Sequence, residues 1–349
     1  MQSSYISTLS WTTSSLNAIP RIQGEIAKAN TELATGRMAD TGLTLGVRTS
    51  HSVDLRTEKN SLQGLVEGNA LIDAMTIRSQ TALSAMTTTS NDFLKNLLSG
   101  QATAGTAPQL ETEARAALSS FTSALNSTDG TRYVFGGVNS SVLPVKDYSV
   151  SASAVVNAAY AAKFGLNPAD PQGDPKVKDI TAAQMQDFLD HEFADIFEDP
   201  SWGTNFSNAS DEAITKQISP TERATVSVSA NEQAMRKLSM AFTMVGYLGV
   251  QNMNSNALQA VMDTARTAVT EGVTGLTAAA AAIGVTQTRV KAATTQMQGT
   301  LDVVTSRIST LEGVDTAEAK TRLDALTNQL NMSYSTTSTL MKLSILNYA

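Results

Sequence analysis

Three stretches near the two ends of the chain decide the fold: IPRIQGEIAKANTEL at residues 19–33, VKAATTQMQGTLDVVTSRISTL at residues 290–311, and LDALTNQLNMSYSTTSTL at residues 323–340. In each stretch, apolar side chains recur at spacings of three and four residues. Such spacing places an apolar stripe along one side of an α-helix. A stripe at both ends, with a differently composed middle, predicts a chain that runs out as a helix and returns beside itself.

The composition favours thin helical bundles. The 349 residues are 42% hydrophobic but only 5% aromatic and 16% charged. This is too hydrophobic for a disordered chain. It is too poor in aromatic residues for one broad globular core, and narrow bundles with small interface residues fit better. The net charge of −7 and the lack of a basic run argue against a nucleic-acid partner.

The chain has no cysteine, which excludes disulfides and thiolate chemistry. Residues 1–20 contain no basic segment followed by an apolar one, as a signal peptide would. No stretch reaches the roughly 18 consecutive apolar residues of a membrane span. We therefore expect either a cytosolic protein or export without a cleaved signal peptide, and no membrane partner.

Catalytic signals are weak throughout the sequence. The two histidines are His51 and His191, and His191-Glu192 lacks the second histidine of a zinc-protease helix. No GxSxG, phosphate-binding or dinucleotide-binding motif occurs. The acidic stretch 187–199 lacks the spacing of a calcium loop, and we interpret it as a solvated helix face. The sequence predicts no catalytic residue, no cofactor and no metal site, and hence no enzyme.

Helical periodicity covers most of the chain. The predicted helices span residues 51–99, 108–126, 231–247, 256–271, 278–311 and 315–346. We expect Gly36 to end the first helix and residues 36–46, with three glycines, to form a turn. We expect Gly272 and Gly275 to interrupt the chain after residue 271, and Gly313 to break it again. The stripe in 51–99, from Leu62 through Met86 to Leu97, is interpreted as intramolecular core.

The middle of the chain has a different character. Six of the eight prolines lie between residues 131 and 224. Tyr133-Val134-Phe135 is typical of a strand that Gly136-Gly137 ends, and residues 225–229 alternate like another strand. We predict a mainly α fold, an elongated antiparallel helical bundle or coiled coil formed by both termini, with an inserted mixed α/β or β-rich domain. The predicted domains are 1–46 with 305–349 (terminal coiled coil), 47–130 with 225–304 (helical rod), and 131–224 (outward-facing insert).

The terminal helices 19–33 and 323–346 differ from the inner ones. They have no third helix of matching length, and serine, threonine and asparagine separate their leucines. A pair of such helices would bury little, so we hypothesise that neighbouring subunits complete them. The residues of this assembly seam are Ile19, Ile22, Ile26, Leu33, Leu323, Leu326, Leu330, Leu340, Leu343 and Leu346.

Three segments carry a resemblance to a known family. They are residues 26–48 (IAKANTELATGRMADTGLTLGVR), residues 131–137 (TRYVFGG), and the C-terminal pair 314–319 (VDTAEA) and 343–349 (LSILNYA). Together they resemble the flagellin superfamily, and within it the hook-associated junction proteins. The most discriminating residues are Tyr133, Phe135, Gly136 and Gly137. The resemblance covers about residues 1–137 and 225–349.

The resemblance implies a structural role in the bacterial flagellum, outside the cell, after export without a cleaved signal peptide. The implied function is an adapter at the junction of hook and filament on which flagellin polymerises. The implied partners are copies of the chain in a ring, another hook-associated protein, flagellin, and the flagellar export chaperone and export apparatus. Two alternatives stay open, the filament flagellin itself and a coiled-coil binding module with no flagellar role.

Overall fold

The computed structural model describes residues 8–99 and 105–346. The chain divides into two compact units, one formed by residues 1–64 with 297–349 and the other by residues 65–296. Two long helices, α3 (Thr49–Ser99) and α10 (Ser255–Glu312), contribute residues to both units. The predicted insert, 131–224, belongs to the same compact unit as its flanking helical segments, and the three-part division of the chain stays a prediction.

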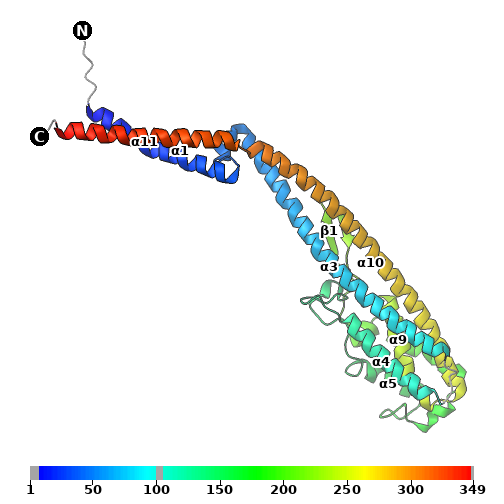
Figure 1. Cartoon of the computed structure of the whole chain (residues 1–349). Coiled ribbons are helices and arrows are strands. Elements are labelled where there is room, and N and C mark those ends of the chain that lie inside the picture. The colour runs from blue at the N-terminus through cyan, green and yellow to red at the C-terminus, as the bar shows by residue number, and fades with distance from the viewer. Residues whose placement is uncertain (1–7, 100–104, 347–349) are drawn as a thin grey trace. The chain divides into compact units, whose positions relative to one another are not determined.

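The first unit is built around the two terminal helices. Figure 1 shows α1 (Thr8–Thr35) and α11 (Thr316–Leu346) lying side by side. Gly36 ends α1 with a φ of +66°, as the sequence predicted. Gly313 separates α10 from α11, also as predicted. The mainly α fold formed from both termini is thus confirmed.

The segment between α1 and α3 is more ordered than the simple turn the sequence indicated. It contains a short helix, α2 (Thr41–Leu45), followed by a 3-10 turn at Gly46–Arg48. The side chain of Asp40 caps α2 by accepting a hydrogen bond from the backbone N–H of Leu43 at 2.9 Å. This bond satisfies a donor that would otherwise be free at the helix start.

The second unit has its core between α3, α4 (Ala107–Leu125) and α9 (Gln233–Tyr247). Phe242 of α9 makes edge-to-face contacts with Phe93 of α3 and Phe121 of α4, with ring centroids 5.2 and 5.6 Å apart. Leu83 and Met86 of α3 are completely buried in the same core. The predicted intramolecular role of the α3 stripe is confirmed.

The predicted interruption at Gly272 and Gly275 is wrong, because α10 runs unbroken through both. A Cβ at Gly272 would overlap the side chain of Leu238, and one at Gly275 would lie 2.6 Å from the Cβ of Ala234. The two glycines therefore let α9 approach α10 closely. This packing offsets the roughly 1 kcal/mol by which glycine disfavours a helix interior.

The insert contains both helices and strands, the first of the two predicted alternatives. Its helices are α5 (Ala152–Phe164), α6 (Ala182–Phe188), α7 (Ala194–Ile196) and α8 (Ser201–Asn205), with 3-10 turns at Gly137–Asn139 and Pro175–Asp179 and a π-helical turn at Leu189–Phe193. Strands β1 (Thr215–Ser219) and β2 (Glu222–Thr225) pair antiparallel. Neither predicted strand is observed as such, since β2 ends at Thr225. Of residues 133–135, Tyr133 forms an isolated bridge with Thr128 and the other two lie in a turn.

The few aromatic residues are concentrated in this insert. Phe188, Phe193, Phe197 and Trp202 follow one another in ring contact, with centroids 5.2 to 6.4 Å apart. All four side chains are almost completely buried. The insert thus has its own run of packed aromatic rings, in addition to the Phe93–Phe242–Phe121 cluster of the helical segments.

One 18-residue window of α10 has the length and hydropathy, 1.4 on average, that would allow it to cross a membrane. This departs from the expectation that no stretch qualifies. One such helix is weak evidence for a membrane span. Of that window, 28% is buried inside the fold, and Leu276 and Ile283 of α10 belong to the core of the second unit.

Candidate assembly interface

The line along which α1 and α11 meet is narrow. Ile22 and Ala29 of α1 and Ala319 of α11 are almost completely buried. The other predicted seam residues whose side chains the structure describes are only half-buried: Ile19, Ile26, Leu33, Leu323, Leu326 and Leu330. The side chains of Leu340, Leu343 and Leu346 lie outside the described residues. Two helices can cover only one side of each other, so this pair leaves part of its apolar surface in water.

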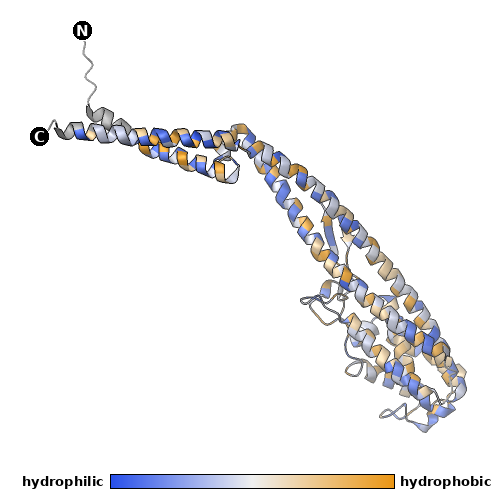
Figure 2. Cartoon of the chain, viewed as in Figure 1, coloured by the Kyte–Doolittle hydropathy of each residue, from blue (hydrophilic) through white to orange (hydrophobic). Residues whose placement is uncertain are grey.

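Polar contacts set the register of the pair. Gln23 Nε2 donates to Tyr334 Oη at 3.0 Å, and Arg322 Nη1 pairs with Glu32 Oε2 at 3.1 Å. Gln23 precedes Glu32 in α1, whereas its partner Tyr334 follows Arg322 in α11. The two helices are therefore antiparallel. Figure 2 shows hydrophilic and hydrophobic residues mixed along both helices. The Gln23–Tyr334 contact is exposed and contributes little stability, whereas Glu32 is mostly buried at its ion pair with the half-exposed Arg322.

A backbone bridge joins the ends of α1 and α10. The N–H of Met38 donates to the carbonyl of Glu312 at 2.8 Å, and the N–H of Val314 donates to the carbonyl of Gly36 at 3.1 Å. These bonds flank an antiparallel bridge between Arg37 and Gly313. The first unit therefore has a fixed joint at the point where α1 ends and α11 begins.

A buried carboxylate lies at this joint. The side chain of Glu312 is fully buried and accepts two hydrogen bonds from Arg56 of α3, at 2.7 and 2.6 Å. Ser52 donates to the same carboxylate, and Arg37 lies 3.9 Å away. The hydrogen bonds from Arg56 lower the pKa of Glu312 against the opposing effect of burial. A buried charge with this many partners fixes one arrangement of the joint.

The segment that contains α2 exposes large apolar side chains. Leu43 is 80% exposed and Val47 is 95% exposed. The backbone beneath them is held by Thr44 Oγ1, which donates to the carbonyl of Asp40 at 2.6 Å, and by Thr49 Oγ1, which donates to that of Gly46 at 2.7 Å. Sequence analysis treated this region as a turn and did not single out these residues. We call the side chains of Leu43 and Val47 the apolar knob; exposed apolar side chains are common on protein surfaces, and these two are free to contact another molecule.

The motif at Tyr133–Gly137 lies within the second unit and passes between two other loops. Phe135 is completely buried, and its carbonyl accepts from the N–H of Ala230 at 2.8 Å. Gly137 has a φ of +59°, and a Cβ there would lie 2.5 Å from the carbonyl oxygen of Ser210 and 2.7 Å from that of Glu212. Glycine is the residue that fits both the left-handed backbone and the missing space.

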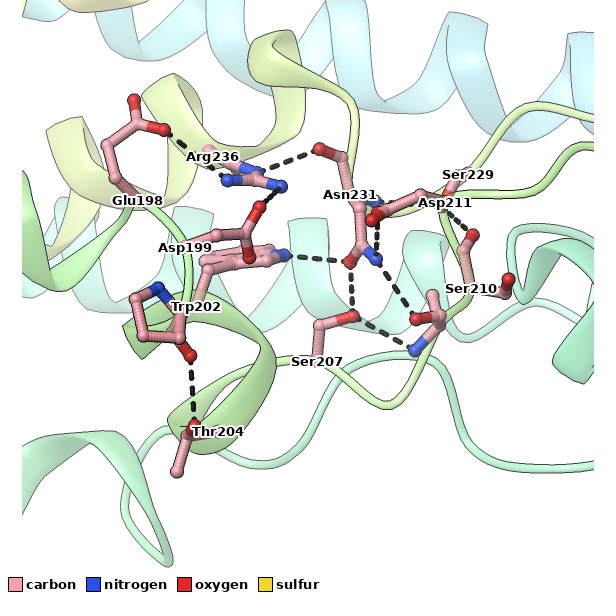
Figure 3. A network of polar contacts seen from close by, with 12 residues as sticks. Glu198, Asp199, Trp202, Thr204, Ser207, Ser210, Asp211, Ser229, Asn231 and Arg236 are labelled. Carbon is pink, nitrogen blue, oxygen red and sulfur yellow. Dashed lines mark hydrogen bonds and ion pairs between the residues drawn. The ribbon is translucent and has the colours of Figure 1, made fainter.

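A polar network next to this motif centres on Asn231 (Figure 3). The Oδ1 of Asn231 accepts from Trp202 Nε1 at 2.9 Å and from Ser207 Oγ at 2.5 Å. Its Nδ2 donates to the carbonyl of Ala209 and to Asp211 Oδ1, at 3.0 and 2.7 Å. The amide thus uses both its ends to join α8, the loop after it and the start of α9. Sequence analysis did not find Asn231, because its partners lie 20 to 29 residues away.

The carboxylates of the acidic stretch 187–199 are exposed, but four of them are also paired, which corrects the simple solvated interpretation. Lys163 of α5 contacts Asp187 at 2.7 Å and Glu192 at 2.6 Å. Arg236 of α9 contacts Asp199 at 2.6 Å and Glu198 at 3.4 Å. The hydrogen bond from Lys163 lowers the pKa of Asp187. These carboxylates therefore tie their segment to α5 within the insert and to α9 outside it.

Over residues 8–99 and 105–346, no group of three or more histidine, cysteine, aspartate or glutamate side chains is placed to hold a metal ion. His191 is exposed on its helix, and its Nδ1 lies 2.9 Å from the carbonyl oxygen of Asp187. His51 is exposed as well.

Comparisons with known proteins agree with this architecture. The family profile of the bacterial flagellin N-terminal helical region matches residues 6–140, and that of the bacterial flagellin C-terminal helical region matches residues 266–349. A solved structure assigned as a flagellar hook-associated protein from Vibrio parahaemolyticus is similar to the chain, with a TM-score of 0.52 and 10% identity. The similarity covers 76% of this chain and 97% of that one. No curated protein matches the sequence.

The two flagellin profiles cover both ends of the chain, where the structure has α1 to α4, most of α10, and α11. The similar structure shows the same fold at low sequence identity. From these matches, the chain belongs to the flagellin family and is a structural component of the bacterial flagellum, an extracellular appendage.

Proposed function

We propose that this protein is the adapter between hook and filament, the third hook-associated protein of the flagellum, and that flagellin polymerises on a ring of its copies. The observation that carries the proposal is the half-covered apolar seam between α1 and α11. A monomer that leaves Leu326 and Leu330 half in water gains by packing them against neighbouring subunits. Completing the burial of a leucine is worth up to about 1.5–3 kcal/mol.

Assembly multiplies this gain. Each copy in a ring presents the same seam, so several weak contacts form together and act as one strong contact. The exposed knob at Leu43 and Val47 supplies further apolar surface on a fixed backbone. The monomer stays soluble because no single seam is strong enough to hold two copies.

The choice of the junction protein over the filament flagellin rests on Tyr133–Gly137. The structure adds a reason for both glycines: a Cβ at Gly136 would lie 3.0 Å from the carbonyl oxygen of Asn139, and one at Gly137 would lie 2.5 Å from that of Ser210. Similarity of fold to a protein assigned as flagellar hook-associated supports the same choice. The insert, residues 131–224, faces outward in this proposal.

The proposal includes the remaining partners. They are a second hook-associated protein, flagellin, and the export chaperone and export apparatus through which the chain leaves the cell unfolded, without a cleaved signal peptide. The absence of cysteine is compatible with that route, since no disulfide has to be opened. No nucleic acid, membrane, cofactor or metal takes part.

The position of the protein on isolated flagella tests the function. Antibody labelling of hook–basal bodies carrying filaments should give one band where the hook ends. Labelling along the whole filament would identify a filament flagellin instead. No labelling at all, with purified protein that still oligomerises, would favour a coiled-coil binding module.

Truncation tests the seam itself. Removing residues 323–349 should leave the second compact unit, residues 65–296, folded, because α11 belongs to the other unit. The truncated protein should be unable to support filament growth. Filaments of normal length on hooks that carry the truncated protein would overturn the assigned role of α11.

A further inference from the structure

The first compact unit holds a small, positively charged pocket that the proposed function does not use. The pocket has a volume of about 210 Å³, and its lining residues are Arg37, Arg56, Lys59, Asn60, Thr305 and Ile308. All six belong to the same unit, on the bridge after α1, the first part of α3 and the last part of α10. Because small-molecule sites usually exceed roughly 300 Å³, this pocket fits a single chemical group.

Positive charge exceeds negative charge at this pocket. Three of its lining residues are cationic, and none is acidic. Within residues 8–99 and 105–346, Glu312 is the one carboxylate that forms an ion pair with any of the three. Asp302, one turn before Thr305 on α10, forms none with them. Glu312 balances one positive charge, so two remain without a counter-charge.

The cationic side chains are accessible to a ligand. Those of Arg37 and Arg56 are each 49% exposed. Arg37 approaches Glu312 only to 3.9 Å, whereas Arg56 uses Nε and Nη2 on that carboxylate and keeps Nη1 available. Lys59 is half-buried, and its ammonium group forms neither an ion pair nor a hydrogen bond with a described residue. N–H donors of all three cations are therefore open to an incoming group.

Two uncharged polar side chains of the lining are available as well. On α10, the hydroxyls of Thr288, Thr294 and Thr310 each donate to the backbone carbonyl four residues earlier. Thr305 lacks this bond, and neither it nor Asn60 forms a side-chain hydrogen bond with another described residue. Both are exposed. A hydroxyl and an amide beside the cations thus supply two further donors.

This set of donors matches an oxyanion. Guanidinium and ammonium groups bind carboxylates and phosphates through short, charge-assisted hydrogen bonds. We infer that the pocket binds one oxyanion group, a carboxylate or a phosphate, with Arg37 and Lys59 as its charged partners and Asn60 and Thr305 as additional donors. The bound group connects Arg37, on the bridge after α1, to α3. Since it binds only the folded arrangement, it stabilises the joint.

Two sources can present this group, a free phosphate ion or an aspartate or glutamate of a neighbouring copy. The chain has 32 acidic and 25 basic residues, so a second copy offers carboxylates in excess.

The first arm of the test measures binding of small oxyanions. The full-length protein is titrated with sodium phosphate, and separately with sodium acetate, at an ionic strength held constant with sodium chloride. The amide signals of Asn60 and Thr305 are followed by NMR. Saturable shifts are expected with phosphate and acetate. Lys59→Met and Arg37→Met should each weaken phosphate binding at least about threefold, because each removes one charged partner, whereas Lys59→Arg should keep it.

Matched controls separate the pocket from the overall charge of the chain. Lys95→Met removes an exposed lysine of α3 that does not line the pocket, and it should bind phosphate like the wild type. Arg56 stays unchanged throughout, because the buried Glu312 depends on it. Melting curves establish that each variant is folded. Equal phosphate affinity in Lys59→Met, Arg37→Met and the wild type would overturn the proposal.

The second arm identifies the source. Carbodiimide treatment of a concentrated mixture of ¹⁵N-labelled and unlabelled full-length chains joins a carboxylate to a lysine amine as an amide, and the carbodiimide takes up the water that is lost. A peptide that links Lys59 of one chain to an acidic residue of another, found by mass spectrometry, supports a neighbouring copy. Saturable phosphate binding without that link supports a free ion. Neither result contradicts the inference, whatever the role of the protein in the flagellum: a pocket that binds no oxyanion at all does so.

Discussion

The carboxylate of Glu312 and the guanidinium of Arg56 form a two-bond ion pair, at 2.7 and 2.6 Å, between residues 256 positions apart in the chain. Glu312 is the last residue of α10, and Arg56 lies in the third turn of α3. The pair fixes the end of one long helix to the start of the other, beside the bridge that holds α1.

Removing Arg56 should loosen this joint. Arg56→Met keeps most of the alkyl stem and leaves the buried Glu312 with Ser52 and the more distant Arg37, so we expect a loss of about 1–3 kcal/mol in the stability of the first unit. Hydrogen exchange of α1 and α11 amides measures it. Arg48→Met, an exposed change on the neighbouring 3-10 turn, should have no effect. Equal exchange in both variants would show that the pair contributes nothing.

The same carboxylate predicts how the joint responds to acid. Arg56 lowers the pKa of Glu312 in the folded chain below the 4.5 of a free glutamate, so the folded state favours the ionised form. Its contribution is complete above about pH 4.5 and is lost as the pH falls through the folded pKa. Stability of the first unit should therefore drop more steeply below pH 4.5 in the wild type than in Glu312→Gln. Glu318→Gln, which alters an exposed carboxylate, should keep the wild-type slope.

Alanine substitutions at two glycines with nearly the same backbone conformation distinguish the cost of backbone strain from the cost of steric overlap. Gly137 has a φ of +59° and faces two carbonyl oxygens, whereas Gly165 has a φ of +61° with nothing within 4 Å. Gly165→Ala should lower the free energy of unfolding by about 1–2 kcal/mol, because alanine disfavours the left-handed backbone conformation. Gly137→Ala should cost at least 1–3 kcal/mol more, because the loops at Ser210 and Glu212 must move. Thermal unfolding followed by Trp202 fluorescence compares the two, and equal costs would contradict the packing argument.

The glycines of α10 should respond to alanine in opposite directions. Gly284→Ala adds a methyl group with only an ordinary contact at 3.6 Å, and better helix propensity should stabilise the chain by roughly 0.5–1 kcal/mol. Gly272→Ala should destabilise it, because the new methyl group overlaps Leu238. Chemical denaturation of the two variants gives the signs directly. A stabilising Gly272→Ala would mean that α9 and α10 pack less closely than described.

The terminal helices should be the least protected part of the monomer. Since Ile26, Leu33, Leu326 and Leu330 are half-buried, amides of α1 and α11 should exchange with solvent orders of magnitude faster than those of α9, whose Leu238 and Phe242 are fully buried. Hydrogen exchange at low protein concentration provides the comparison. Protection of the termini equal to that of α9 would exclude the idea that neighbours complete them.

Local patterns predicted the helices well. The bounds expected for α3 and α4 are each within two residues of those observed. Here burial follows from spacing alone, as for Leu83 and Met86. The predicted break at Gly272 and Gly275 was wrong for a physical reason. A glycine can end a helix or allow another helix to pack closely, and which of these occurs depends on its tertiary neighbours. The neighbour of Gly272 is Leu238, which is distant in sequence.

The polar part of the candidate interface was out of reach from sequence. Glu312 has no local partner, and its pairing with Arg56 exists only once α3 and α10 have folded. Asn231 was also missed, because the sequence around it does not distinguish an asparagine that joins α8, the following loop and the start of α9 from one in an ordinary turn. The motif at Tyr133–Gly137 was found by resemblance. Why it needs glycine at position 137 became clear only from the structure, in which two carbonyl oxygens face that residue.

The bridge between Arg37 and Gly313 gives the first unit a mechanical property. Its backbone hydrogen bonds, from Met38 to Glu312 and from Val314 to Gly36, connect the segment after α1 to the segment that joins α10 and α11. Tension applied to either terminal helix is therefore shared by α3 and α10 instead of passing along a single covalent strand.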